Sequence, residues 1–179
     1  MKEKIKKIDW FEFINIYLNI VYFEKNNLKQ QFQDFFKKTN INHSTESLFE
    51  EFIIFNLFID YAIFLLHFSK EKAHLLYETL EENMVAKLIM MDYKIDNSLF
   101  MKKVEERFTE YLKCLKEFTP RGIKRWNINK HFGSELGKKF AKNFIGEEKN
   151  PLVIYPATFL FLTKVKVFNS FLEEIKVIF

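Results

Sequence analysis

The amino-acid sequence predicts an all-α fold: a single-domain bundle of about six helices with a buried central helix at about residues 44–68. The first 119 residues contain no glycine and no proline, and all four glycines and all three prolines fall between residues 120 and 156. Because these residue types punctuate turn-rich β folds, a long stretch without them indicates helices joined by short polar turns. A length of 179 residues and a hydrophobic content of 48% suffice for one domain, residues 1–179, with a sizeable core.

The first helix is predicted to begin after Asp9, whose side chain suits the N-cap position. Apolar residues then recur at three- and four-residue spacing, and phenylalanines further on extend the pattern toward residue 36. Asn26 and Asn27 leave open whether this region is one helix or two. The polar run over residues 39–44 indicates a loop. The apolar positions of the pattern are Ile14, Leu18, Val21, Tyr22, Phe32, Phe35 and Phe36.

The central helix is apolar nearly all round, which is typical of a helix surrounded by other helices. Ser69 is a suitable N-cap for a third helix that runs to about residue 91, with Glu71 in its first turn. A turn over residues 92–98 then precedes a fourth helix over residues 99–118.

Residues 120–156 are predicted to form a glycine- and proline-bearing basic insertion between helices. Pro120 ends the fourth helix, a fifth helix covers residues 130–145, and Gly146 is placed to cap its C-terminus. Pro156 fits the first turn of a final helix that ends near residue 176. Residues 164–168 alternate as a strand does, but helix is favoured because the sequence offers no partner strand.

Positive charge is concentrated in this insertion. Residues 119–145 carry seven cations and a single acidic residue, Glu135, whereas the whole chain has a net charge of +4. Such a patch attracts nucleic acid or lipid headgroups, and a tryptophan within it could stack on a base; the alternative is an ordinary solvated helix face. The candidate residues for binding an anionic or protein partner are Arg121, Lys124, Arg125, Trp126, Lys130, Lys138, Lys139 and Lys142.

A second group of candidates lies on the central helix. Asp60 and His67 are polar exceptions in an apolar segment, and Glu71 and His74 extend the same stripe if the helix continues past Ser69. Side chains at i, i+4 and i+7 share a helix face, so these four residues could hold Fe, Mn or Zn. The alternative is structural: Asp60 and Asn56 hydrogen-bond to a neighbouring helix or a buried water.

The spacing His67-x-x-x-Glu71-x-x-His74, with Asp60 seven residues before His67, resembles the ligand spacing on one helix of heme-oxygenase-like di-metal oxidases. The resemblance covers about fifteen of the 179 residues. In that family the helix comes late in the chain, whereas here the pattern lies in the first half. The resemblance implies a metal-binding oxidase or carrier, and the rest of the sequence predicts no cofactor.

The sequence also bears on location. The N-terminal residues are charged and are followed by no apolar run of the signal-peptide type, and residues 151–163 are too short to cross a bilayer. No transmembrane segment is therefore predicted. A single cysteine, Cys114, indicates a reducing compartment, so the expected location is the cytoplasm.

The sequence favours a non-enzymatic protein that works by binding another protein or a second copy of itself, with residues 121–142 as the contact surface. Common catalytic signatures such as Gly-x-Ser-x-Gly and His-Glu-x-x-His are absent from it. The alternatives are a metal- or small-ligand-binding bundle and a nucleic-acid-associated regulator. Twenty-three phenylalanines leave room for an exposed apolar patch or for an internal apolar pocket.

Overall fold

The computed structural model describes residues 6–23, 28–39, 41, 46–90, 93, 96–117 and 130–179, without the side chains of residues 97, 115–117 and 130–134. The predicted all-α class is confirmed, since the described residues form seven α-helices and a π-helical turn, accompanied only by two short strands. In chain order the elements are β1 (Lys6–Asp9), α1 (Trp10–Leu18), the π-helical turn η1 (Asn19–Phe23), α2 (Leu28–Thr39), α3 (Glu46–His67), α4 (Lys70–Met90), α5 (Asn97–Glu117), α7 (Lys130–Ile145), α8 (Pro151–Glu174) and β2 (Ile175–Ile178).

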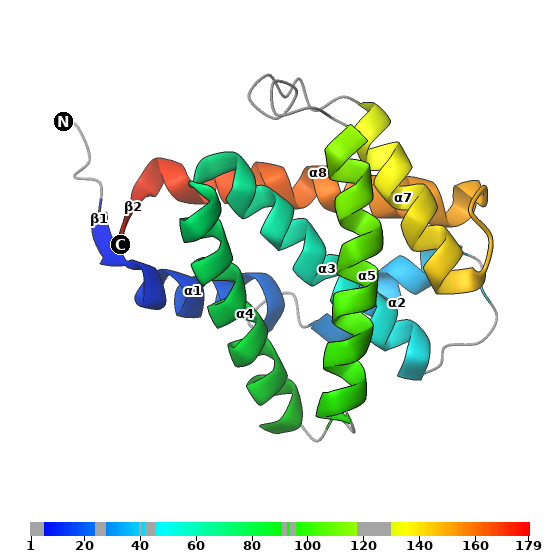
Figure 1. Cartoon of the computed structure of the whole chain (residues 1–179), viewed down its shortest axis with the longest axis horizontal. Helices are drawn as coiled ribbons and strands as arrows, with labels where there is room; N and C mark the ends of the chain where they lie inside the picture. The colour runs from blue at the N-terminus through cyan, green and yellow to red at the C-terminus, as the bar shows by residue number, and fades with distance from the viewer. Residues whose placement is uncertain are drawn as a thin grey trace.

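The buried central helix is also confirmed. Helix α3 is buried without interruption from Glu51 to Asp60, so its apolar residues face neighbours on every side. Helix α3 crosses the middle of the view, with α4 and α5 in front of it and α8 behind (Figure 1). The helix ends at His67, and a new helix begins at Lys70.

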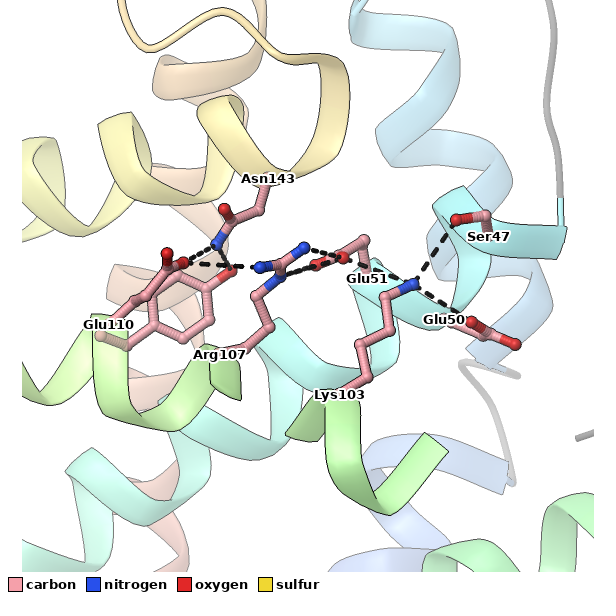
Figure 2. A network of polar contacts seen from close by, with 8 residues as sticks. Ser47, Glu50, Glu51, Lys103, Arg107, Glu110 and Asn143 are labelled. Atoms are coloured by element: carbon pink, nitrogen blue, oxygen red, sulfur yellow. Dashed lines mark hydrogen bonds and ion pairs between the residues drawn. The ribbon is translucent and has the colours of Figure 1, made fainter. Parts of the chain in front are cut away.

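A polar network joins α5 to α3, and Asn143 of α7 extends it by donating to Glu110 of α5 at 2.9 Å (Figure 2). Arg107 on α5 donates from Nε and Nη2 to the buried Glu51 carboxylate of α3 at 2.9–3.1 Å. Lys103 pairs with Glu50 of α3 at 3.1 Å. Because such a two-pronged guanidinium contact satisfies both carboxylate oxygens, the network sets the register between α3 and α5.

Helix α7 packs closely along α8, and a glycine permits the approach. A Cβ atom added to Gly137 would lie 3.0 Å from the carbonyl oxygen of Ile154 and 3.1 Å from Oγ1 of Thr158. The predicted C-terminal cap is confirmed: Gly146 has φ of 77° and donates its backbone N–H to the carbonyl of Lys142 at 2.9 Å. This positive φ is the backbone conformation that glycine adopts without strain.

The start predicted for the final helix is wrong. Helix α8 begins at Pro151 rather than near Pro156, because Asn150 acts as its N-cap and accepts a hydrogen bond from the backbone N–H of Leu152 at 3.0 Å. Pro151 then occupies the first helical position, where its missing N–H has no consequence. Pro156 lies inside the helix, and residues 164–168 are helical as predicted.

The expectation that the sequence offers no pair of strands is wrong. Strand β2 pairs in parallel with β1, with Lys6 opposite Ile175 and Ile8 opposite Val177. Strands β1 and β2 lie at opposite ends of the described chain, so a local sequence pattern does not reveal that they pair. In Figure 1 the two strands lie next to each other at one end of the bundle. Their pairing buries Ile8, which is 2% exposed.

Among the described residues, α8 alone is long and apolar enough to cross a membrane by the criteria of length and composition. Core helices of globular proteins meet the same criteria. In this structure one face of α8 packs against α2, α3 and α7.

Candidate ligand-binding site

The fully buried carboxylate of Asp60 on α3 is the centre of a polar cluster. Tyr17 donates a hydrogen bond from its hydroxyl to Oδ1 of Asp60 at 2.7 Å, and Tyr22 donates to Oδ2. The Nζ of Lys164 lies 3.0 Å from Oδ1 and 3.1 Å from Oδ2, and it also donates to the Tyr22 hydroxyl. Both carboxylate oxygens are therefore hydrogen-bonded, as a buried charge requires.

The π-helical turn explains how two tyrosines of one segment reach the same carboxylate. Tyr17 lies in α1 and Tyr22 lies five residues later in η1. In a continuous α-helix, residues five apart point about 140° away from each other. The wider π-helical turn between them brings both hydroxyls to Asp60.

Burial and charge set the protonation of this cluster. Desolvation lowers the pKa of the Lys164 ammonium, and the Asp60 carboxylate acts in the opposite direction. Desolvation, followed by the charge of Asp60, raises the pKa of Tyr17 and of Tyr22 well above the ordinary range. Both tyrosines therefore keep their protons, and their hydroxyls donate hydrogen bonds to the carboxylate.

Lys164 makes two further contacts in this cluster. Its Nζ lies 4.3 Å from the centroid of the Tyr22 ring, a cation–π contact, and 3.5 Å from the backbone oxygen of Asn56. The Nδ2 of Asn56 donates to the carbonyl of Phe52 at 2.8 Å. Within the described part of the chain, Oδ1 of Asn56 is a buried side-chain oxygen without a hydrogen-bond partner.

A pocket of about 390 Å³ reaches this cluster from the surface. It lies between the α1–η1 segment, α2 and α8. Two members of the cluster, Tyr17 and Lys164, are almost fully buried and form its floor, at 2% and 6% exposure. Its apolar wall consists of Ile20, Val21, Phe35, Phe52, Pro156, Phe159, Leu160 and Val167.

Polar side chains gather at the mouth of the pocket. Asp34 accepts a hydrogen bond from Gln30 at 2.9 Å and lies 3.9 Å from the Nζ of Lys37. Lys38 places its Nζ 5.9 Å from the centroid of the Phe159 ring. No carboxylate forms an ion pair with Lys38 among the residues that the structure describes. Lys38 is thus a cation at the mouth that is available to a ligand.

The four residues of the predicted metal stripe are not brought together. The stripe requires a helix that continues past Ser69, and that premise is wrong, because α3 ends at His67. Asp60 is held by Lys164 and the two tyrosines. His67 instead packs against the ring of Phe168, with centroids 5.2 Å apart.

The other two residues of the stripe lie on α4. Glu71 is exposed in its first turn, and His74 lies 3.2 Å from the exposed Glu78. Among the described residues, no three His, Cys, Asp or Glu side chains are grouped so that they could hold a metal ion. Asp60 is a hydrogen-bonded core residue, as the structural interpretation expected, whereas Asn56 donates to the carbonyl of Phe52 in its own helix instead of to a neighbouring helix.

The basic candidates are described only in part. Arg121, Lys124, Arg125 and Trp126 lie outside the described residues, as does the side chain of Lys130. On α7, two of the three remaining lysines are paired with glutamates: Lys138 with Glu135 at 2.5 Å and Lys139 with Glu148 at 3.0 Å. The third, Lys142, is exposed.

Tyr17, Tyr22 and Lys164 were not candidates from the sequence. One signal could have identified Lys164: it interrupts the apolar face of α8 that includes Phe161, Val165 and Phe168. A lysine within such a face requires a buried acid, and Asp60 was the evident acid within the central helix. The two tyrosines gave no such signal, because the π-helical turn, which the sequence does not reveal, brings their hydroxyls to Asp60.

No protein-family model, curated protein or solved structure matches this chain. The chemistry of the pocket follows from its own residues. They offer an apolar wall, an ion pair at the floor that is already neutral, and a cation at the mouth.

Proposed function

We propose that this protein binds a small amphipathic carboxylate in the pocket between α1–η1, α2 and α8, and that it acts as a carrier or sensor rather than an enzyme. The observation that supports the proposal is the pocket itself, an apolar wall that leads from Lys38 at the mouth to Lys164 at the floor. This is the small-ligand alternative from the sequence, with a pocket in place of the metal site.

The volume of the pocket limits the size of the ligand. A cavity of roughly 150 Å³ holds benzene, so 390 Å³ suits about 12 to 16 non-hydrogen atoms. This volume lies at the lower end of the range typical of small-molecule sites. An unbranched carboxylate such as decanoate or dodecanoate has this size.

The distribution of charge sets the orientation of the ligand. At the floor, the charge of Lys164 is neutralised by Asp60, so the floor offers no net attraction to a second anion. At the mouth, Lys38 is available, whereas the neighbouring Asp34 is engaged by Gln30 and Lys37. The carboxylate therefore lies near Lys38 and the chain points inward along the apolar wall.

Titration calorimetry with decanoate tests this proposal. Lys38→Glu is expected to weaken binding by about tenfold or more, because it replaces the attracting cation with a repelling anion. Lys142→Glu is the matched control: it makes the same charge change at a lysine of α7 that is exposed and does not line the pocket. Leu160→Trp, which places a large side chain on the pocket wall, is expected to abolish binding.

Two results would contradict the proposal. One is an absence of heat with both decanoate and dodecanoate. The other is an equal loss of affinity in Lys38→Glu and Lys142→Glu, which would indicate general electrostatic attraction instead of a site at the mouth. Decyltrimethylammonium has a similar apolar chain and the opposite charge, and it is expected to bind more weakly than decanoate.

The hypotheses of a protein partner or a nucleic-acid partner at the basic residues 121–142 stay predictions. Retention on DNA or RNA that weakens with added salt would support the second. Co-purification of a partner that is lost in Arg121→Glu with Lys124→Glu would support the first.

A further inference from the structure

Helix α8 presents an apolar stripe on its exposed face. Leu152, Tyr155 and Phe159 are spaced by three and four residues, so they lie one above another on the helix, and they are 48%, 74% and 64% exposed. Thr163 and Lys166 continue the same face toward its polar end. Isolated exposed apolar residues are ordinary, but three in register on one helix form a contiguous patch.

Lysines adjoin this stripe. Helix α2 packs on α8 and carries three lysines against one aspartate, and its Lys38 reaches the ring of Phe159. Lys37 is exposed on the same helix, and Lys166 lies two turns beyond Phe159 on α8. Apolar and aromatic side chains bordered by lysines are the composition of surfaces that lie at the boundary of an anionic bilayer.

The composition of α8 supports the same interpretation. Its most apolar 18-residue window has a mean hydropathy of 1.4, yet only 33% of that window is buried within the protein. Part of this hydropathy therefore comes from apolar residues on the exposed face, among them Leu152, Tyr155 and Phe159. The inner face carries Lys164, paired with Asp60, so α8 remains packed in the bundle while its outer face is available.

We propose that the stripe Leu152–Tyr155–Phe159, with Lys38 and Lys166, docks the protein on the surface of an anionic lipid bilayer. The tyrosine hydroxyl and the lysine ammonium groups lie at the headgroups, and the apolar side chains enter the boundary below them. This inference stands on the exposed surface and does not require the pocket to be occupied.

Docking in this orientation also gives the pocket a route to the lipid. Phe159 belongs both to the stripe and to the pocket wall, and two other wall residues, Ile20 and Val167, are 43% and 44% exposed. Phe159 therefore joins the docking surface to the pocket wall, and a molecule that leaves the bilayer at this face arrives beside the pocket.

Vesicle flotation tests the docking surface. The probes are vesicles of phosphatidylcholine alone and vesicles with about a quarter phosphatidylglycerol. The protein is expected to float with the anionic vesicles, less so at high salt, and not with the neutral ones. The double variant Leu152→Ser with Tyr155→Ser is expected to weaken this binding by about tenfold, because it removes the apolar contact.

The matched control is Ile89→Ser with Met90→Ser, which removes two exposed apolar side chains from α4 and is expected to change vesicle binding by less than about twofold. Lys166→Glu tests separately how much positive charge contributes to vesicle binding. It is expected to weaken binding to the anionic vesicles alone. Equal flotation of the double variant and the unaltered protein overturns the proposal, as does an absence of flotation with anionic vesicles. A dimer that dissociates in the double variant, without vesicle binding, also overturns it, because a second copy would then cover the stripe.

Failure of the docking proposal is distinguishable from failure of the proposed function. Leu152 and Tyr155 do not line the pocket, so the double variant is expected to bind decanoate in vesicle-free solution as the unaltered protein does. Vesicle binding without decanoate binding would overturn only the carboxylate pocket. Decanoate binding without vesicle binding would overturn only the docking surface.

Discussion

The carboxylate of Asp60 draws three side chains from the two ends of the chain to one point in the core. Tyr17 and Tyr22 come from its first elements and Lys164 from its last helix. A buried ion pair is weak evidence of net stabilisation, but removal of one partner leaves a charge without compensation. Substitution of Lys164 alone is therefore expected to be costly, because it leaves the Asp60 carboxylate buried without its cation.

Lys164→Met is expected to lower the free energy of unfolding by about 3 to 5 kcal/mol, because Asp60 is left buried without its cation. Adding Asp60→Asn is expected to restore part of the loss, since it removes the unpaired charge. Lys166→Met, two residues away and exposed, is expected to change stability by less than about 0.5 kcal/mol. Denaturant unfolding measures all three, and equal effects at the two lysines would contradict the buried pair.

Ionisation of Glu81 on α4 lowers the stability of the folded protein as the pH rises. Burial raises the pKa of its carboxyl from the ordinary value of 4.5, while a hydrogen bond from Tyr77 at 2.7 Å acts in the opposite direction. A raised folded-state pKa means that the folded protein holds this proton more tightly than the unfolded chain. Stability from this group is therefore present below about pH 4.5 and is lost as the pH rises through the folded-state pKa.

Glu81→Gln is expected to make the protein more stable than its parent at neutral pH and to flatten this decline, because the amide oxygen still accepts from Tyr77 and no charge forms. Glu82→Gln, at the exposed neighbouring position, is expected to keep the decline. Thermal unfolding over a pH series separates the two. An identical pH profile in the parent and Glu81→Gln would show that Glu81 is not the responsible group.

At the level of single residues, the sequence identified Asp60 but not its partners. A lone acid in an apolar helix is visible in the sequence because it breaks the local pattern. Tyr17 and Tyr22 fit the apolar pattern of the first helix, so nothing local distinguishes them from core residues. Their role depends on a π-helical turn, whose backbone geometry the residue spacing does not specify.

Helices α7 and α8 pack closely where Gly137 of α7 meets α8. Gly137→Ala would gain about 0.5 to 1 kcal/mol of helix propensity at an exposed site. Here the added methyl group would press on the Ile154 backbone oxygen, which has no rotamer with which to move aside. The substitution is therefore expected to lower the free energy of unfolding by about 1 to 2 kcal/mol. Lys142→Ala, at an exposed position of the same helix, is the control for propensity, and a stabilising Gly137→Ala would contradict the close packing.

The element boundaries show where local patterns suffice. The N-cap at Asp9 and the C-cap at Gly146 were predicted, and the structure confirms both, because each depends on one residue and its immediate neighbours. The start of α8 was predicted five residues late, because Pro156 looked like an N-terminal proline when Asn150 and Pro151 already supply that signal. When one segment holds two signals for the start of a helix, the sequence alone does not show which one is used. The choice depends on how α8 packs against α7.

Over the whole molecule, the parallel pair of β1 and β2 joins the two ends of the described chain. Deletion of residues 175–179 is expected to lower the melting temperature by about 5 °C, since Ile8 would lose its cover. Deletion of residue 179 alone leaves the strand intact and is expected to have a smaller effect. Circular dichroism follows both, and an unchanged melting temperature in the longer deletion would show that the strand pair adds nothing to stability.

The all-α class and the buried central helix were predictable, because both follow from composition and periodicity along one stretch of chain. The pocket was not, since its wall combines α1–η1, α2 and α8 and no local pattern states how these elements meet. The same holds for the strand pair, whose partners are more than 160 residues apart. The pocket and the strand pair were not predicted because both depend on contacts between segments that are distant in the sequence.

The late position of Lys164 has a consequence for synthesis on the ribosome. Asp60, Tyr17 and Tyr22 emerge from the exit tunnel more than a hundred residues before their cation does. Until then, burying the carboxylate is unfavourable, and the apolar length of α3 stays exposed to chaperones and to other nascent chains. The polar cluster around Asp60 is therefore completed only after α8 has been synthesised.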